Sequence, residues 1–307
     1  MSNRSVLVRY LHNLTKRLHA YYKDTMLSEQ YAWWTFETIT EKTRSQLISS
    51  KEFELSAEQK ALIEKWVHAL TKEHMPIQYL IGHVPFCDLT ITVKKPTLIP
   101  RPETEQWCTD IIEQCLHYRD AQPLRILDLC SGTGCIGLAC AQTLPDAQVV
   151  CVDNMIEAIE LGRFNAQQNN LHNVTFILSD LFEKLAGMQF DLILTNPPYI
   201  SEDEFLKLDC SVSAWEDKKA LVADDSGYAL IKKIITQSVS YIRPNDTLAG
   251  FGIPQLVIEH GSTQSPQIVD LMRNAGYIHV RTHKDLSGKD RVVSGRLPYV
   301  VTTKKTE

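Results

Sequence analysis

The sequence predicts an α/β protein, in which a mainly parallel sheet carries helices on both faces and follows a small helical domain. From residue 124 onward, strand-like apolar runs alternate with helical stretches, a pattern typical of parallel sheets. The first 75 residues show helical periodicity instead. The first predicted strand leads into a glycine-containing turn and a helix, and such sheets bind ligands at the carboxyl ends of their strands.

The overall composition argues against several classes of protein. Of the 307 residues 44% are hydrophobic, and the net charge of −5 argues against a broad basic surface for nucleic acid. The eight cysteines form no CxxC pair and no zinc-ligand spacing, so we expect free thiols, a reducing compartment and no metal site. The sequence shows neither an apolar stretch of membrane-spanning length nor a signal peptide. We therefore expect a soluble, intracellular protein.

Residues 1–76 are predicted to form a helical domain. An apolar stripe at helical spacing starts the chain, and a second helix is predicted to begin near Ser28. A third is predicted to begin at Ser56 and to end before Met75-Pro76. No acidic residue precedes Asp24, which is also typical of a mitochondrial presequence. Because the next predicted helix follows almost at once, we interpret the start as a domain helix. The bacterial cytoplasm is then the expected compartment, with the mitochondrial matrix as the alternative.

Residues 77–102 are predicted to form a β-hairpin linker. Leu89–Val93 alternates apolar and polar side chains, and glycine and prolines flank it. A helix is predicted directly afterwards, with Glu103 and Glu105 in its first turn, where negative charge is favourable. We expect a third domain over residues 103–307.

The third domain is predicted to alternate strands and helices and to close with a hairpin between Asp285 and Gly295. The predicted strands are Arg125–Leu129, Gln148–Asp153, Val174–Ser179, Phe190–Thr195 and Leu256–Glu259. The predicted helices are Ile136–Leu144, Met155–Asn169, Tyr228–Arg243 and Gln267–Ala275.

A glycine turn and three acidic residues at successive strand ends predict a nucleoside site. The turn runs from Asp128 to Gly134 and lets the backbone approach a ligand closely, but it lacks the glycine pattern of dinucleotide sites. Asp153 ends the second strand, where a carboxylate can bind both ribose hydroxyls, and Asp180 follows the third. Each acid alone is better explained as a helix or turn cap. Together with the turn they favour an adenosine ligand.

The segment Asn196-Pro197-Pro198-Tyr199 follows the fourth predicted strand. Two prolines fix two φ angles and push the residues before them into extended geometry, so the segment is a stiff, non-helical turn. It presents backbone carbonyls, one amide and one aromatic ring, which suits a planar NH2 group. The alternative is an ordinary loop at a strand end.

These motifs resemble the class I S-adenosylmethionine-dependent methyltransferases that modify amide or amine nitrogen. The segments Leu98–Glu105 (LIPRPETE) and Asn196–Ile200 (NPPYI) narrow the resemblance to the peptide chain release factor glutamine methyltransferases, the PrmC/HemK family. The resemblance covers nearly the whole chain. It implies a seven-stranded Rossmann-like sheet and S-adenosylmethionine as cofactor. It also implies methylation of N5 of a glutamine in a GGQ-type release factor loop, in support of translation termination, with the helical domain docking the substrate.

The resemblance also assigns residues to the site. It implies that the cofactor contacts Asp128, Cys130, Ser131, Gly132, Thr133, Gly134, Asp153, Asp180, Leu181 and Asn196. It implies that the substrate contacts Arg101, Glu103, Asn196, Pro197, Pro198 and Tyr199, of which Asn196, Pro197 and Tyr199 are catalytic. For Arg101 and Glu103 the alternative is an ion pair that sets the angle between the domains.

We expect the reaction to depend on orientation of a weakly nucleophilic amide. The Asn196 side-chain carbonyl and the Pro197 backbone carbonyl would accept the two N–H bonds, and Tyr199 would pack against the flat amide. The proton can leave after transfer, so no strong base is required. Cys130-Ser131, Leu181 and Glu216-Asp217 depart from common family residues and put cofactor affinity in doubt rather than the reaction.

Three other functions fit parts of this pattern. A ribosomal protein glutamine methyltransferase would share the pocket, and an adenine-N6 DNA methyltransferase would use the same turn but needs a basic groove and a flipped base. The third is a cofactor-binding module without activity, against which the intact Asn-Pro-Pro-Tyr turn argues. We expect a release factor as protein partner, no direct nucleic-acid binding, no membrane association and a monomer.

Overall fold

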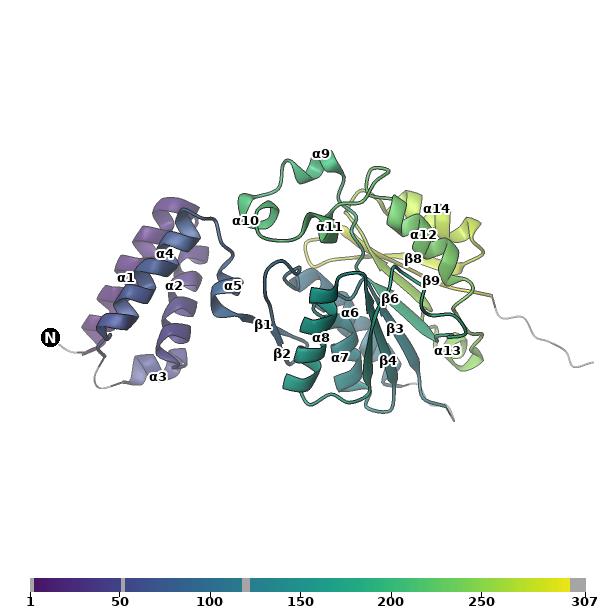
Figure 1. Ribbon diagram of the computed structural model, residues 1–307, viewed down its shortest axis with the longest axis horizontal. Coiled ribbons are helices and arrows are strands. Elements are labelled where there is room, and N and C mark those ends of the chain that lie inside the picture. Colours follow the sequence, from purple (N-terminus) through teal and green to yellow (C-terminus); the bar gives the residue numbers. More distant parts are fainter. Residues whose placement is uncertain (1–2, 51–52, 118–121, 299–307) are drawn as a thin grey trace, which may run out of the picture. The chain divides into compact units, whose positions relative to one another are not determined.

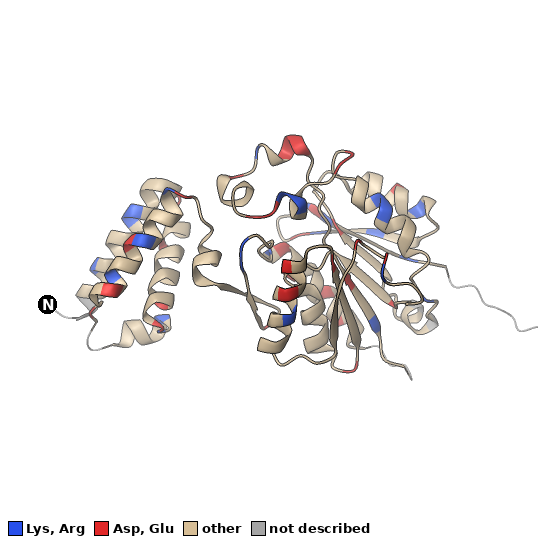
Figure 2. Cartoon of the chain, in the orientation of Figure 1, with Lys and Arg blue, Asp and Glu red and all other residues tan. Residues whose placement is uncertain are grey.

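Residues 3–50, 53–117 and 122–298 are described in the computed structural model (Figure 1). The chain divides into a helical unit, Met1–His83 with Asp209–Trp215, and a sheet unit, Val84–Leu208 with Glu216–Glu307. Lys and Arg are interspersed with Asp and Glu along the ribbon of each unit (Figure 2). The described helices include none that is long and apolar enough to cross a membrane.

The helical unit is built from helices packed around one apolar core. Its helices are α1 (Asn3–Tyr22), α2 (Thr25–Thr40), α3 (Arg44–Ser49), α4 (Ala57–Thr71) and α5 (Ile77–Ile81). Ser56 caps α4 as predicted, in a capping box with Gln59. The prediction that α2 begins near Ser28 is wrong. Asp24 is its cap, and the Ser28 hydroxyl bonds back to the Asp24 carbonyl inside the helix.

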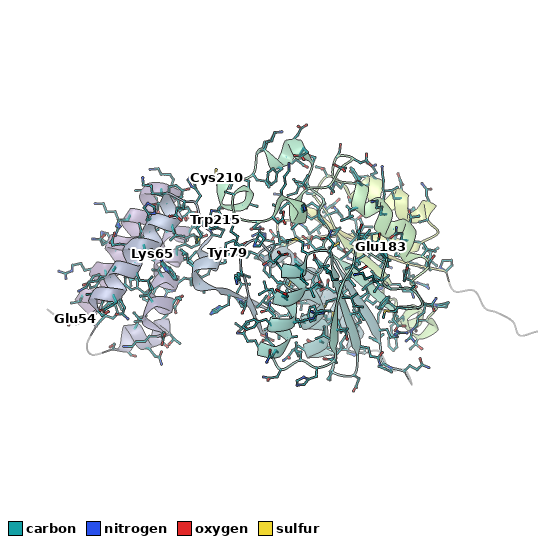
Figure 3. All side chains as sticks on the ribbon, viewed as in Figure 1. Glu54, Lys65, Tyr79, Glu183, Cys210 and Trp215 are labelled. Carbon is teal, nitrogen blue, oxygen red and sulfur yellow. The ribbon has the colours of Figure 1, made fainter. Side chains whose placement is uncertain are left out.

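A segment far along the chain completes the helical unit. Residues 209–215, which include α10 (Cys210–Ser213), pack with the helices although they follow the Asn-Pro-Pro-Tyr turn in sequence. The Trp215 indole N–H donates to the Glu73 carbonyl at 2.9 Å. The ring centroids of Trp215 and Tyr79 lie 6.5 Å apart, and Figure 3 shows the two side chains near one another. The chain therefore passes between the two units three times.

The sheet unit contains seven strands in one sheet, which confirms the predicted α/β fold. The order is β5-β4-β3-β6-β7-β9-β8. Strands β5 to β7 in this order pair in parallel, and β9 runs antiparallel to both of its neighbours. The strands are β3 (Arg125–Leu129), β4 (Gln148–Asp153), β5 (Val174–Leu178), β6 (Leu192–Thr195), β7 (Leu256–Glu259), β8 (Ile278–Lys284) and β9 (Asp290–Arg296).

Helices cover both faces of this sheet (Figure 1). Successive side chains of β3 point to opposite faces. Leu127 and Leu129 join the core that α12 and α14 cover, whereas Asp128 faces α7. The larger helices are α6 (Pro102–Cys115), α7 (Cys135–Thr143), α8 (Ile156–Gln168), α12 (Ala229–Ser238) and α14 (Ser265–Asn274), and the shorter ones are α9 (Glu202–Phe205), α11 (Lys218–Leu221) and α13 (Asp246–Phe251).

Two predicted elements of the third domain fall short of the expected bounds by two or more residues at one end. The strand expected from Phe190 begins at Leu192, and Phe190 makes only an isolated bridge with Ile242. The helix expected to reach Arg243 ends at Ser238, because the chain turns there and Arg243 N–H donates to the Phe190 carbonyl. Both differences lie near the start of β6, away from its carboxyl end.

The predicted hairpin consists of β1 (His83–Phe86) and β2 (Leu89–Thr92). Asn165 of α8 and Asn169, the residue that caps its carboxyl end, hold β2 through their side-chain amides. Asn165 both donates to and accepts from the Thr92 backbone, and Asn169 does the same with Thr90. These bonds fix the start of the following loop, which reaches the candidate site.

Candidate active site

A cavity of about 310 Å³ lies at the carboxyl ends of β3, β4 and β6. This volume falls in the range of sites for small organic ligands. The predicted residues that line it are Arg101, Cys130, Ser131, Gly132, Thr133, Asp153, Asp180, Leu181, Asn196 and Pro198. Five other predicted site residues are not part of the lining that the described residues form: Glu103, Asp128, Gly134, Pro197 and Tyr199.

The glycine turn forms the floor of the cavity. Gly134 has φ +80°, and an added Cβ would lie 3.0 Å from the Phe176 ring, so only glycine fits the turn and the packing behind it. The Ser131 N–H donates to the Val152 carbonyl at 2.9 Å, which ties the turn to β4. The Ser131 hydroxyl is buried and has no partner among the described residues. It is a polar atom beside the cavity that a bound ligand can satisfy.

Asp153 joins this turn to the end of β4. One carboxylate oxygen accepts the Gly132 N–H at 2.8 Å, and the other accepts the Met155 N–H at 2.9 Å. Burial raises the pKa of Asp153, while these backbone donors act in the opposite direction. Asp153 therefore caps the local backbone, which is the alternative role that the sequence allowed. It also lines the cavity.

Asp128 lies behind the turn and supports it. Its side chain is fully buried, and one oxygen accepts the Gly137 N–H near the start of α7 at 2.8 Å. Its other oxygen has no partner among the described residues. Burial raises the pKa of Asp128 to about 7. Its geometry is that of a support for α7 rather than of a cavity wall.

The Asp180–Leu181 segment forms another wall. Asp180 is exposed and Leu181 is buried, and both line the cavity. The preceding Ser179 N–H donates to the Asp153 carbonyl at 2.9 Å, so this wall is tied directly to the end of β4. Leu181 offers an apolar surface where an aromatic ring could have stacked on a base.

The Asn-Pro-Pro-Tyr turn meets the cavity at Asn196 and Pro198. The Asn196 side-chain N–H donates to the Thr104 hydroxyl at 3.2 Å. The Tyr199 hydroxyl donates to Glu259 at 3.5 Å, and the Tyr199 backbone carbonyl accepts from the Gln264 side chain at 3.0 Å. The turn is therefore held at both ends by side chains from other elements.

Sequence reasoning missed three of these supporting residues: Thr104, Glu259 and Gln264. Thr104 lies within the LIPRPETE segment, and Glu259 ends a predicted strand, so both stood in patterns that had been noticed. Neither pattern indicates that Thr104 bonds to Glu259, because the two residues are 155 positions apart in the sequence.

Arg101 makes an ion pair and also lines the cavity. Its guanidinium contacts both carboxylate oxygens of Glu216, at 2.6 and 2.7 Å. Both residues belong to the sheet unit. Glu103 is exposed and lies beside Trp107 and Arg291 at a smaller cavity on another side of α6.

Comparisons with known proteins identify the class and then the family. The family model "Methyltransferase small domain" matches residues 108–209, and "PrmC N-terminal domain" matches residues 10–82. With the seven-stranded sheet and the glycine turn, these matches define a methyltransferase with an added helical domain.

Release factor glutamine methyltransferase from Escherichia coli (strain K12) is 38% identical over 260 residues, which cover 85% of this chain and 89% of that protein. The protein of the same name from Clostridium acetobutylicum is 32% identical, covering 83% of this chain and 86% of that protein. The chain belongs to the release factor glutamine methyltransferase family.

The similarity of this chain to solved structures is lower. The ribosomal protein L11 methylase from Lactobacillus delbrueckii subsp. bulgaricus has a TM-score of 0.47 and 16% identity, covering 68% of this chain and 86% of that chain. A methyltransferase from Pyrococcus furiosus has a TM-score of 0.49 and 13% identity, covering 79% of this chain and all of that chain.

The predictions of the family and of an S-adenosylmethionine-dependent methyltransferase are confirmed. The cavity also fits this cofactor on its own chemistry. Asp153 offers a carboxylate at a strand end, the unpartnered Ser131 hydroxyl offers a polar contact, and Leu181 offers an apolar wall. Which of the predicted side chains touch the cofactor remains a prediction.

Proposed function

We propose that this chain transfers a methyl group from S-adenosylmethionine to the N5 amide nitrogen of a glutamine in the GGQ-type loop of a peptide chain release factor, and so supports translation termination. The observation that carries the proposal is the position of Asn196. Its side chain lies on the wall of the cavity that also contains the glycine turn and Asp153. An amide is thereby placed where an amide-bearing substrate and the cofactor would meet, in a chain that is 38% identical to a release factor glutamine methyltransferase.

The chemistry requires orientation more than activation. S-adenosylmethionine supplies a methyl group on a positively charged sulfur. The nitrogen of a glutamine amide is a poor nucleophile, because its lone pair is delocalised into the carbonyl. The Asn196 side-chain carbonyl and the Pro197 backbone carbonyl would accept its two N–H bonds and aim the lone pair. Two acceptors in a partly buried site would also polarise the nitrogen.

The remaining residues would hold this arrangement. Pro197 is buried, and the two prolines stiffen the turn that carries both acceptors. The Tyr199 ring lies outside the described lining, so its packing against the substrate amide stays a prediction. The proton would leave the nitrogen after transfer, without a strong base.

The site residues assigned from the sequence form part of the proposal. We assign Asp153, the turn from Cys130 to Gly134 and the Asp180–Leu181 segment to the cofactor, with Asp128 acting behind them through α7. The helical unit would dock the protein substrate, and Arg101, which lines the cavity while paired with Glu216, would contact the substrate. The contribution of Glu103 stays a prediction.

A protein substrate is favoured over DNA. The net charge of −5 and the interspersed charges in Figure 2 favour it over a duplex with a flipped base. The named relatives are bacterial, which supports the bacterial cytoplasm as compartment. A monomer without membrane association stays a prediction.

Transfer of labelled methyl groups tests the substrate directly. The full chain is incubated with labelled S-adenosylmethionine and, separately, with a release factor, a ribosomal protein fraction and DNA. We expect label only in the release factor, at the loop glutamine located by mass spectrometry. A release factor with that glutamine replaced by alanine is the matched control and should stay unlabelled. Label confined to ribosomal protein or to DNA would reject the proposal.

A further inference from the structure

We propose that Thr104 and Glu259 are positioning residues that fix which way the Asn196 amide faces, so that its carbonyl oxygen is left for the substrate. The inference rests on the proposed function for the role of that oxygen. The orientation of the amide itself follows from the hydrogen bonds and can be measured separately.

Glu259 is a buried acceptor at the end of β7. Its side chain is almost fully enclosed, as are those of Thr104 and Trp107 in the first turns of α6. Thr104 and Trp107 are three residues apart and so lie on the same face of that helix. The Thr104 hydroxyl and the Trp107 indole N–H each donate to the same Glu259 oxygen, Oε2, at 2.7 Å.

The direction of these bonds is fixed by the chemistry of the donors. An indole N–H can only donate, and a charged Glu259 carboxylate can only accept. Burial raises the pKa of Glu259, whereas the bonds from Trp107 and Thr104 and the charge of Arg291 lower it and favour the carboxylate. A hydroxyl carries one proton, and that of Thr104 is committed to Glu259. Thr104 Oγ can therefore only accept from its other neighbour, the Asn196 side chain 3.2 Å away.

This leaves one orientation for the Asn196 amide. If the amide were flipped, its oxygen would face the Thr104 oxygen with no proton between them. The NH2 group must then point to Thr104, and Oδ1 is left without this partner. Asparagine orientation is normally assigned from such networks, and here the network originates in a carboxylate. Oδ1 is the atom that must accept an N–H from the substrate glutamine.

Glu259 also reaches the other end of the turn. Its second oxygen, Oε1, accepts from the Tyr199 hydroxyl at 3.5 Å, a longer and weaker bond. Burial raises the pKa of Tyr199, so the phenol stays protonated and donates. One buried carboxylate thus connects both functional side chains of the turn, directly to Tyr199 and through Thr104 to Asn196.

Paired substitutions on α6 test the relay. Thr104→Val keeps the shape and removes the hydroxyl, whereas Thr104→Ser keeps the hydroxyl. Thr109→Val is the matched control, because its hydroxyl bonds within the helix to the Glu105 carbonyl. We expect T104V to lower kcat at least about tenfold relative to T109V, a loss of the size that one hydrogen bond gives. The KM for each substrate should stay similar, and T104S should stay within about threefold of the natural chain.

Three outcomes would overturn the inference. They are a kcat for T104V within about twofold of T109V, a T104S variant as slow as T104V, or a T104V variant whose loss lies in KM for S-adenosylmethionine. The last would mean that Thr104 acts as a direct cofactor contact. Thermal unfolding should show both variants fully folded at the assay temperature. T104V should be the less stable of the two, because it leaves the buried Glu259 carboxylate short of one donor, whereas the Thr109 hydroxyl has no charged partner.

A second measurement needs no substrate. In protein with isotope-labelled asparagine amides, the Asn196 NH2 signal is the one missing from the spectrum of N196A. We expect T104V to shift this signal and speed its exchange with water, and T109V to leave it unchanged. An unchanged signal in T104V would refute the orientation. If the natural chain fails to methylate release factor, the proposed function fails, while this spectrum still decides how the amide is held.

Discussion

Arg101 and Glu216 form an ion pair in which one guanidinium nitrogen meets both carboxylate oxygens, although 115 residues separate them in sequence. The Glu216 side chain is 1% exposed, whereas that of Arg101 is 33% exposed. Burial raises the pKa of Glu216, and the charge and hydrogen bonds of Arg101 counter this effect. Glu216 directly follows the segment 209–215 of the helical unit, so the pair fixes the point where the chain re-enters the sheet unit.

Loss of Arg101 is expected to destabilise the sheet unit. Arg101→Ala leaves a buried carboxylate without its partner and should lower the free energy of unfolding by about 2 kcal/mol, discounted for the partial exposure of the arginine. Denaturant unfolding measures the change. The double variant Arg101→Met/Glu216→Leu removes both charges and should recover most of the loss. If the double variant is as unstable as R101A, the unpaired charge is not the cause.

Much of the sheet could be predicted because its central strands are largely buried, β6 and β7 along their whole length. The bounds of β3, β4 and β7 agree with the predicted runs, since each is a short apolar stretch bounded by turns. The error at Ser28 has a local cause. Serine is a good cap, but Asp24 lies four residues earlier and takes that position.

The cavity could be predicted because parallel strands end at the same edge of a sheet. Residues 128–134, Asp153 and Asp180 belong to consecutive strand ends and converge for that reason. Glu259 and Trp215 could not be placed from the sequence, because their partners come from α6 and from the helical unit. No local periodicity encodes which distant helix packs on a strand end.

Removal of the Asn196 side chain is expected to stop transfer and to spare cofactor binding. Asn196→Ala deletes the proposed acceptor for the substrate amide, so kcat on release factor should fall at least about a hundredfold. Calorimetry should show S-adenosylmethionine binding within about threefold of the natural chain. Near-normal turnover in N196A would remove Asn196 from the mechanism.

Substitution of Asp153 is expected to have the opposite signature. Asp153→Ala removes a carboxylate from the cavity wall and two backbone bonds that shape it, so the Kd for S-adenosylmethionine should rise about 10- to 100-fold. With cofactor in excess, kcat should be largely restored. Asp146→Ala, an exposed aspartate in the turn before β4, is the control and should bind normally. Unchanged affinity in D153A would argue against a role in binding.

Asp128 is expected to make stability depend on pH. Its pKa is about 7 in the folded chain, mainly because of burial, and about 4 in an unfolded one. The folded state therefore binds this proton more tightly, and the stability present below the unfolded pKa is lost as the pH rises toward 7. Between about pH 5 and pH 8 the natural chain should lose up to about 3 kcal/mol relative to Asp128→Asn. Urea unfolding across this range measures the difference. A constant difference would show that Asp128 does not titrate there.

Gly227 is expected to control the turn through its backbone. Its φ is +86°, and an added Cβ would lie 2.0 Å from the Tyr199 carbonyl oxygen and 2.8 Å from the Gln264 side-chain nitrogen that binds it. Gly227→Ala should therefore displace Tyr199 and lower kcat by about tenfold or more. The affinity for the cofactor should be largely kept, because Gly227 lies outside the described cavity lining.

Gly187→Ala is the control that separates the steric clash from backbone strain. Gly187 has φ +80° with nothing within 4 Å of the added Cβ, so this variant should lose about 1 kcal/mol of stability and no activity. Equal loss of activity in both variants would mean that strain, and not displacement of Tyr199, is responsible.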